Sequence, residues 1–202
     1  MSRIDRVVLA TNNAKKLREL RRVVDEAGLE LEVLGLTDFP ARPEPEETER
    51  SFEGNAVIKA AAAAAHTGLP ALADDSGLEV EELNWMPGVR SARWAGPQCD
   101  DAANNELLLA QLDGVPTGRR GARFVCALAL VLPDGEQHLW QGVMPGRIVD
   151  QERGAGGFGY DPLFVPDGEE RTSAELSPQE KDAISHRGQA VRQFITWLGE
   201  QR

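Results

Sequence analysis

The fold class follows from the first part of the chain, IDRVVLATNNAKKLRELRRVVDEAGLELEVLGL, which spans residues 4–36. Residues 4–10 form a β-branched and apolar run that is typical of a buried strand. Apolar side chains then recur at helical spacing, at Leu17, Leu20, Val23, Val24 and Ala27. Gly28 ends this helix, and residues 29–36 suit a second strand. A strand, a helix and a strand in succession predict an α/β fold.

The rest of the chain continues this alternation and adds a hairpin. The expected elements are helices over residues 51–66 and 100–112, a short strand over residues 71–73, and antiparallel strands over residues 123–132 and 137–149. Pro133-Asp134-Gly135 supplies the turn of the hairpin. Early strand and helix alternation with a late hairpin predicts a mixed sheet. The connections are short, so we expect one domain over residues 1–202, built as two lobes around a cleft.

Composition limits the classes of function. The chain has 202 residues, 41% of them hydrophobic, and a formal net charge of -11. An acidic surface repels nucleic acid polymers, so an anionic substrate needs local cations or a divalent metal. The longest low-polarity stretch, residues 56–65, is far shorter than the ~20 residues of a membrane helix. The N-terminus carries no signal-peptide pattern, and two cysteines make no disulfide framework. We therefore expect a cytoplasmic protein with no membrane partner.

Thr11-Asn12-Asn13-Ala14-Lys15-Lys16 stands at the junction of the first strand and helix. Free backbone N–H groups at a helix start, together with two lysines, can hold phosphate oxygens. The segment lacks the glycines of a P-loop. Taken alone, it is better explained as a helix cap followed by surface lysines.

Acidic residues form two further candidates. Asp74-Asp75-Ser76-Gly77 is expected at the carboxyl end of the short strand, and Glu46-Glu47 lies on the preceding loop. Mg²⁺ prefers oxygen ligands and is completed by water and substrate phosphates, so one or two converging carboxylates suffice. A carboxylate could also activate a water for attack at phosphorus. For most of the loop glutamates, a solvated acidic surface explains the pattern.

A glycine-dense segment, Gly154 to Pro162, contains Phe158, Tyr160 and Asp161. The glycines permit close approach of backbone to a ligand, and an aromatic face can stack on a base. Asp161 is an acceptor suited to an N–H on the base edge. Composition alone equally allows a turn that buries both rings in the core.

The last candidate is Lys181 with Ser185-His186-Arg187-Gly188, whose donors could read a purine carbonyl oxygen. On one continuous helix at ~100° per residue, His186 and Arg187 would point away from Lys181. Convergence requires a helix break near Ser185, with Ser185 capping a new helix. The alternative is one long surface helix with unrelated charges. Ser177-Pro178-Gln179-Glu180 marks the start of the preceding helix.

In this order, these segments resemble the inosine triphosphate pyrophosphatase family, which removes deaminated purine nucleotides from the nucleotide pool. The matches span nearly the whole chain. They are residues 11–16, Phe52, Asn55, Ala56, Lys59, residues 73–78, 87–89, 91–93, 157–162, 174–176, Lys181 and residues 185–188.

The resemblance implies a long curved sheet, a homodimer, a Mg²⁺ cofactor, and hydrolysis of ITP, dITP or XTP to the monophosphate and pyrophosphate. It makes Asp75 the base and a metal ligand, and Glu46 a second metal ligand. It implies substrate contacts from Thr11, Asn12, Asn13, Ala14, Lys15, Lys16, Lys59, Ser76, Phe158, Gly159, Tyr160, Asp161, Lys181, His186 and Arg187. Many relatives carry Glu where this chain has Gly54, so Glu47 or Glu53 are alternative metal ligands.

Base selection follows from hydrogen-bond chemistry. Hypoxanthine and xanthine carry a carbonyl oxygen where adenine has an amino group. Donors from Lys181, His186 or Arg187 can bond to that oxygen, but in adenine they face another donor. Unpaired buried groups can discriminate by factors of roughly 10⁴. Two rivals remain at this point: a pyrophosphatase for modified pyrimidine or methylated nucleotides, and a nucleotide sensor without catalysis.

Overall fold

The structure is a computed structural model that describes residues 3–201. The chain divides into two compact units. Unit 1 comprises residues up to 75, residues 127–141 and residues from 189 onward, and unit 2 comprises residues 76–126 and 142–188. Three strands, β3 (Ala71–Val80), β5 (Gly121–Val131) and β6 (Gln137–Ile148), contribute residues to both units.

The strands form a mixed sheet. Their hydrogen-bonded order is β2, β1, β3, β5, β6 and β7, with β4 paired to β3. Strands β1 (Arg6–Leu9) and β2 (Glu32–Gly35) are parallel, and β1 is also parallel to β3. Strand β4 (Met86–Pro87) is antiparallel to β3, and β7 (Phe164–Pro166) is antiparallel to β6. The α/β class with a mixed sheet, predicted from the sequence, is therefore confirmed.

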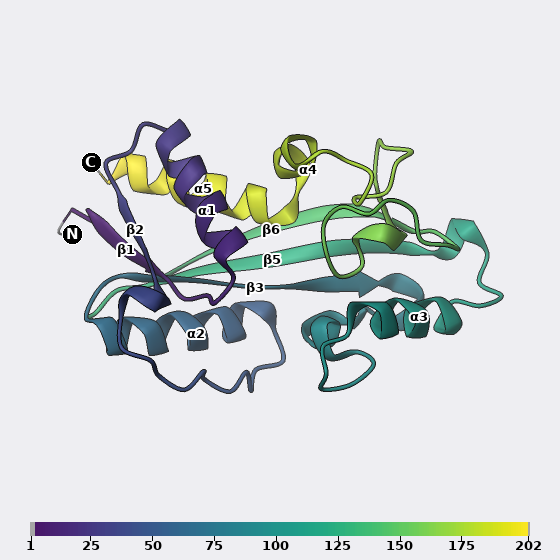
Figure 1. Cartoon of the computed structure of the whole chain (residues 1–202), viewed down its shortest axis with the longest axis horizontal. Coiled ribbons are helices and arrows are strands. Elements are labelled where there is room, and N and C mark those ends of the chain that lie inside the picture. Colours follow the sequence, from purple (N-terminus) through teal and green to yellow (C-terminus); the bar gives the residue numbers. More distant parts are fainter. Residues whose placement is uncertain (1–2, 202) are drawn as a thin grey trace. The chain divides into compact units, whose positions relative to one another are not determined.

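Helices α1 (Ala14–Glu26), α2 (Phe52–Thr67) and most of α5 (His186–Glu200) belong to unit 1. Figure 1 shows α1 and α5 on one side of the strands of this unit and α2 on the other. The apolar stripe of α1 buries Leu20 and Val24, one turn apart. The buried face of α2 consists largely of alanines, which allow the helix axis to approach the strands closely.

Unit 2 has its own apolar core around Leu108, Phe124, Ile148 and Phe164. Its helices are α3 (Asp101–Gln111) and α4 (Pro178–Ile184). Asp100 caps α3 by accepting hydrogen bonds from the amides of residues 102 and 103, as its sequence predicts. The capping box of α4 is also confirmed, because Ser177 and Glu180 bond to each other's backbone amides.

Two expectations about element boundaries have different outcomes. The break between α4 and α5 is confirmed: Ser185 has extended backbone dihedrals, and its Oγ accepts a hydrogen bond from the Gly188 amide at 3.0 Å. The prediction of a short strand over residues 71–73 is wrong, because β3 runs for ten residues and Asp74 to Gly77 lie in its middle. Two acidic residues do not end the strand here because lysines from α1 and α2 neutralise both carboxylates.

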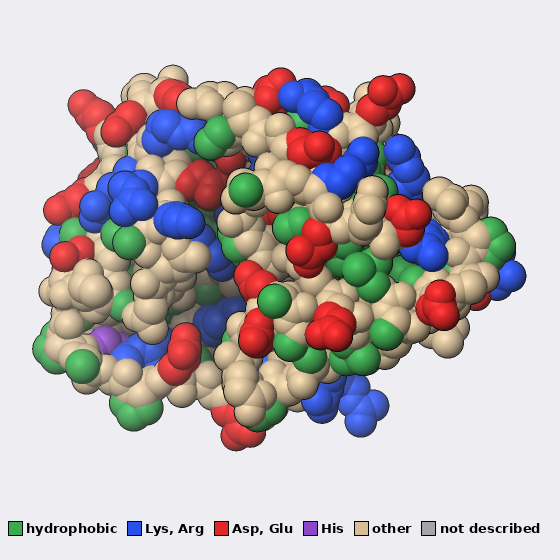
Figure 2. Space-filling model, turned by 45° about the vertical axis from the view of Figure 1, so that its right-hand side comes forward, with side chains coloured by type: hydrophobic (Ala, Val, Ile, Leu, Met, Phe, Trp, Pro, Cys, Tyr) green, Lys and Arg blue, Asp and Glu red, His purple; other side chains and the backbone are tan. Residues whose placement is uncertain are grey.

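The surface carries both signs of charge. On the face shown in Figure 2, acidic and basic side chains are interspersed, so the net charge of -11 does not gather there in one acidic patch. Among residues 3–201, no helix combines the length and apolar character that a bilayer crossing needs.

Candidate active site

Asp75 is the centre of a small charged group in unit 1. Its Oδ1 accepts a hydrogen bond from Lys59 Nζ at 2.9 Å, and its Oδ2 accepts one from Asn55 Nδ2 at 3.2 Å. Lys59 Nζ also donates to Glu47 at 3.0 Å. The side chains of Asp75 and Lys59 are only 13% and 14% exposed. One ammonium thus holds two carboxylates at the edge of solvent.

Helix α2 positions the two donors. Asn55 and Lys59 are four residues apart and therefore point from the same face of the helix. The amide of Asn55 also fixes the loop, because its Oδ1 accepts a hydrogen bond from the Glu49 backbone at 3.0 Å. Asn55 therefore ties the loop that carries Glu47 to the strand that carries Asp75.

The electrostatics of this group favour a proton acceptor. Burial raises the pKa of the Asp75 carboxyl, the neighbouring Glu47 raises it further, and Lys59 and Asn55 offset only part of the increase. For Lys59, burial lowers the pKa, but the two carboxylates outweigh burial, so the pKa lies above its usual value. Lys59 therefore stays charged while Asp75 becomes a stronger base than an exposed aspartate.

Asp74 occupies the opposite face of β3. Consecutive residues of a strand point to opposite sides of a sheet. Both oxygens of Asp74 accept hydrogen bonds from Lys16 Nζ of α1, at 3.0 and 2.8 Å. The acidic pair is therefore divided, with Asp75 facing α2 and Asp74 fastening α1.

Residues 11–16 adopt the capped helix start that the segment alone favours. Asn13 Oδ1 accepts hydrogen bonds from the amides of Lys15 and Lys16, and Thr11 Oγ1 accepts one from the Asn13 amide. The N–H groups of Lys15 and Lys16 are thus satisfied by the protein. The side chains of Asn12 and Lys15 remain exposed at the strand end.

The three glutamates proposed as second metal ligands differ in placement. Glu47 lies within reach of the cation that Asp75 binds, whereas Glu46 is exposed. Glu53 accepts a hydrogen bond from Gln141 at 2.8 Å. Across residues 3–201, no three His, Cys, Asp or Glu side chains are grouped as a metal cage. The cation between Asp75 and Glu47 is the Lys59 ammonium, but two nearby carboxylates are donors of the kind that Mg²⁺ takes, because it needs few protein ligands and completes its shell with water and phosphate.

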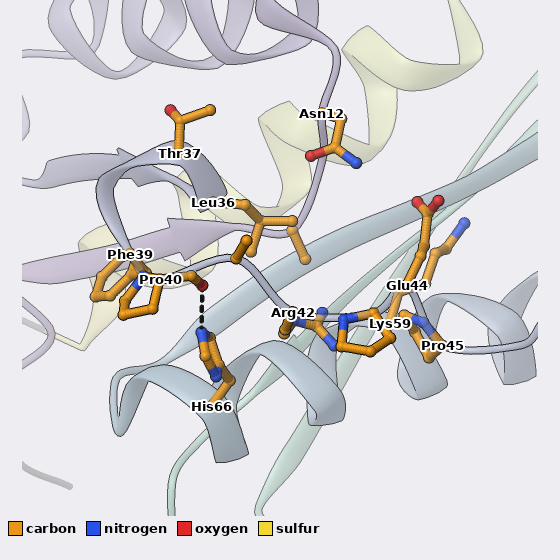
Figure 3. A pocket seen from close by; sticks show the side chains of 13 residues that line it. Asn12, Leu36, Thr37, Phe39, Pro40, Arg42, Glu44, Pro45, Lys59 and His66 are labelled. Carbon is orange, nitrogen blue, oxygen red and sulfur yellow. Dashed lines mark hydrogen bonds between the residues drawn. The ribbon is translucent and has the colours of Figure 1, made fainter.

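A cavity of about 320 Å³ adjoins this group in unit 1. It lies beyond the carboxyl ends of β1 and β2, where ligands of α/β proteins usually bind. Its lining includes Asn12 and Lys59, together with the Pro-rich loop at residues 39–45. Figure 3 shows the loop joined to α2 by the hydrogen bond between His66 and the Pro40 carbonyl, 2.9 Å long. From the sequence, only the acidic residues of this loop stood out as candidates.

The second group of predicted residues lies in unit 2. Phe158 is 53% exposed. Two cations lie over its ring: Lys181 Nζ at 5.3 Å and Arg187 Cζ at 5.8 Å from the ring centre. These distances correspond to cation–π contacts. The helix break at Ser185 thus brings Lys181 and Arg187 to the same aromatic ring.

Asp161 and Tyr160, in the same segment as Phe158, are buried. Asp161 forms an ion pair with Lys181 and accepts a hydrogen bond from the Phe158 amide at 2.9 Å. The Tyr160 hydroxyl donates to the Ser91 carbonyl at 2.8 Å, and burial raises its pKa. Of the two rings in this segment, Tyr160 therefore packs in the core, and Phe158 remains available to a ligand.

His186 stacks on Phe124, with ring centres 5.0 Å apart. Ser76 lies half-buried on β3. Sequence reasoning missed Asn55 as a partner of Asp75, although its spacing of four from Lys59 was a usable signal. It also missed Asp101 and Asn105, which bond to Gly159 from α3.

The comparisons with known proteins identify the family of this chain. A family model described as the Ham1 family matches residues 7–197. A dITP/XTP pyrophosphatase of Cutibacterium acnes is 58% identical over 95% of both chains. A dITP/XTP pyrophosphatase of Nocardia farcinica is also 58% identical, over 96% of this chain and 94% of its own.

Solved structures give the same result. A nucleoside-triphosphatase, or dITP/XTP pyrophosphatase, of Mycobacterium abscessus is 54% identical with a TM-score of 0.80, covering 94% of this chain and 97% of its own. A HAM1 protein of Coxiella burnetii is 45% identical with a TM-score of 0.90, covering 96% and 98%. The family resemblance drawn from the sequence is confirmed. Because the family model and these relatives span nearly its whole length, the chain belongs to the Ham1 family.

Proposed function

We propose that this protein is a Mg²⁺-dependent pyrophosphatase that hydrolyses the deaminated purine nucleotides dITP, ITP and XTP to the monophosphate and pyrophosphate. Relatives that are named dITP/XTP pyrophosphatase and cover almost the whole chain support the substrate class. The observation that carries the chemistry is the half-buried Asp75 carboxylate, held by Lys59 and Asn55 beside Glu47.

Asp75 acts as the base. A water attacks the α-phosphorus, its proton passes to an oxygen of Asp75, and the bond from that phosphorus to the bridging oxygen of pyrophosphate breaks. Lys59 and Asn55 hold the two carboxylate oxygens and so fix the direction of the acceptor. General base catalysis of this kind typically contributes 10²- to 10⁴-fold.

Mg²⁺ would be held by Asp75 and a loop glutamate, and would supply charge stabilisation for the phosphate oxygens. The structure favours Glu47 over the expected Glu46, since Glu47 shares a cation with Asp75. Asn12 and Lys15 at the helix start are exposed donors for the distal phosphates.

Base recognition is assigned to unit 2. The open face of Phe158 is suited to stacking on a purine. Lys181, His186 and Arg187 supply donors for the 6-carbonyl oxygen of hypoxanthine or xanthine. Adenine presents an amino group at this position, so a donor would face a donor. We propose in addition that the protein is a cytoplasmic homodimer. Sedimentation of the purified protein tests the oligomeric state.

The test is pyrophosphate release from a panel of dITP, XTP, dGTP, dATP and a methylated or modified pyrimidine triphosphate, with and without Mg²⁺. We expect Mg²⁺-dependent release that is fastest for dITP and XTP. Preference for a pyrimidine would support the rival pyrophosphatase. Binding without release from any nucleotide would support a sensor and overturn the proposal.

The Asp75→Asn variant tests the role of the base. It keeps the size of the side chain and an acceptor for Lys59 but removes the basic oxygen. We expect the rate of pyrophosphate release to fall by roughly 10²- to 10⁴-fold, with an unchanged circular dichroism spectrum. Release from dITP at the wild-type rate would contradict the assignment of Asp75.

A further inference from the structure

Side chains of helix α3 form hydrogen bonds with Gly159, the residue that follows Phe158. Asp101 Oδ2 accepts a hydrogen bond from the Gly159 amide at 2.7 Å. Asn105 Nδ2 donates to the Gly159 carbonyl at 3.2 Å. Asp101 and Asn105 are four residues apart, so both point from the same face of α3. The helix thus holds both polar backbone atoms of one glycine.

Phe158 needs such external restraint. It stands between Gly157 and Gly159, which have φ angles of +76° and +61°. Glycine backbones reach many conformations that other residues do not, so the flanking glycines allow the ring several directions. The ring is 53% exposed, so packing alone does not fix it. Contacts from outside the segment must therefore set its orientation.

The two residues of α3 are themselves well placed for this task. Asn105 is 3% exposed, and its Nδ2 also donates to Glu152 at 2.9 Å, so its side chain has one orientation. Asp100 caps the helix through the amides of residues 102 and 103. The adjacent Asp101 is therefore not needed as the cap and reaches across to Gly159.

Asp161 is a second restraint on this segment. Asp161 accepts a hydrogen bond from the Phe158 amide, and a β-carbon at Gly157 would collide with the same carboxylate. Asp161 in turn pairs with Lys181, one of the two cations over the ring. The amide on each side of the Phe158 carbonyl thus has a carboxylate acceptor, Asp161 for residue 158 and Asp101 for residue 159.

We propose that Asp101 and Asn105 are positioning residues for nucleobase selection, which fix the Gly159 backbone so that the Phe158 ring stays under Lys181 and Arg187. This inference rests on the proposed function. The residues contact no reacting atom. Their loss lets the ring turn, so a purine is stacked less firmly and its 6-position is no longer aligned with the donors.

The experiment compares Asp101→Ala and Asn105→Ala with the conservative Asp101→Asn, whose amide oxygen can still accept from Gly159. Glu106→Ala is the matched control, since Glu106 is exposed on the same helix. The readouts are kcat and KM for dITP and dATP, and hydrogen–deuterium exchange of a peptide that covers residues 154–163.

For both alanine variants we expect the ratio of kcat/KM values for dITP and dATP to fall about tenfold, the effect of one lost hydrogen bond to a charged or buried group. The loss should lie in KM for dITP, with kcat nearly unchanged. Exchange in residues 154–163 should rise. Asp101→Asn should restore most of the ratio, and Glu106→Ala should match the wild type.

An unchanged ratio in folded Asp101→Ala would overturn the inference, and so would equal losses on both nucleotides, which indicate a general structural defect. If Asn105→Ala does not fold, the exposed Asp101 position still decides the question. Failure of the wild type to release pyrophosphate from dITP would instead overturn the proposed function, so the two failures are distinct.

Discussion

At Asp75, one carboxyl group is subject to burial and to neighbours of both charges. Burial and Glu47 raise its pKa, and Lys59 opposes them. A base with a raised pKa is protonated at a higher pH than an exposed aspartate, so kcat/KM should decline as the pH falls through that raised value. The position of this acidic limb therefore reports on the neighbours of Asp75.

Glu47→Gln should lower the pKa of the Asp75 carboxyl in the metal-free protein, because it removes a negative charge that raises this pKa. It should also raise the Mg²⁺ concentration for half-maximal rate, since one carboxylate near the cation position is lost. Glu46→Gln is the matched control and should change neither quantity, because Glu46 is exposed. The measurements are an NMR titration of the Asp75 carboxyl in the metal-free protein and a Mg²⁺ titration of the rate. If Glu46→Gln changed both quantities and Glu47→Gln changed neither, Glu46 would be the second metal ligand instead.

The sequence singled out Asp75 and Lys59 as candidates but left open which of Glu46, Glu47 and Glu53 lies beside them; in the structure Glu47 does. Residues 44–49 have no periodicity that would tell which side chains turn inward. Glu47 turns inward because the Asn55 side chain binds the adjacent loop backbone, a contact between a loop and a helix. Only the folded chain shows such a contact.

At the scale of elements, the break between α4 and α5 is the feature that gathers the donors near Phe158. A Ser cap contributes about 1 kcal/mol of helix stability. Ser185→Ala should therefore lower the free energy of unfolding by about that amount, measured by urea denaturation. Thr196→Ala, which removes a hydroxyl bonded to the Arg192 carbonyl inside α5, should have a smaller effect. Equal losses in the two variants would argue against a cap at Ser185.

Glu180 in the capping box of α4 gives a prediction for acid stability. The hydrogen bond from the Ser177 backbone lowers its pKa from 4.5 to about 2. A carboxyl whose pKa is lowered in the folded state stabilises the protein above about pH 4.5, and this contribution is lost as the pH falls toward 2. Glu180→Gln should thus be less stable than the wild type at pH 6, with the difference shrinking as the pH falls. A constant difference between pH 6 and 3 in urea denaturation would contradict this.

Helix starts were predictable because their signals are local: Asp100, Ser177 and Ser185 each lie within three residues of the amides they cap. The length of β3 was not. Two consecutive aspartates usually mark the end of a strand, and they are tolerated here because Lys16 and Lys59, which lie 58 and 16 residues from their partners, neutralise them.

At the scale of the whole molecule, three strands supply residues to both compact units. Strand β5 is buried from residue 124 to residue 131, across the boundary between the units. We expect one cooperative unfolding transition, because neither unit can lose this strand alone.

Tryptophans test this expectation, because Trp140 and Trp197 lie in unit 1 and Trp85 and Trp94 lie in unit 2. A variant with phenylalanine at 85 and 94 reports on unit 1, and one with phenylalanine at 140 and 197 reports on unit 2. In each variant, the urea midpoint from fluorescence should coincide with the midpoint from far-ultraviolet circular dichroism. Different midpoints in either variant would show that the units unfold separately.

Because side chains alternate along β3, the register of this strand decides which face of the sheet each aspartate occupies. Removing or inserting a single amino acid before Asp74 would turn each carboxylate toward the other helix. Asp74 would then face α2, and Asp75 would face α1. Conservative point changes on this strand, apart from changes at Asp75 itself, should therefore be tolerated where length changes are not. Single-codon deletions at residues 71, 72 and 73 would each be expected to yield inactive protein.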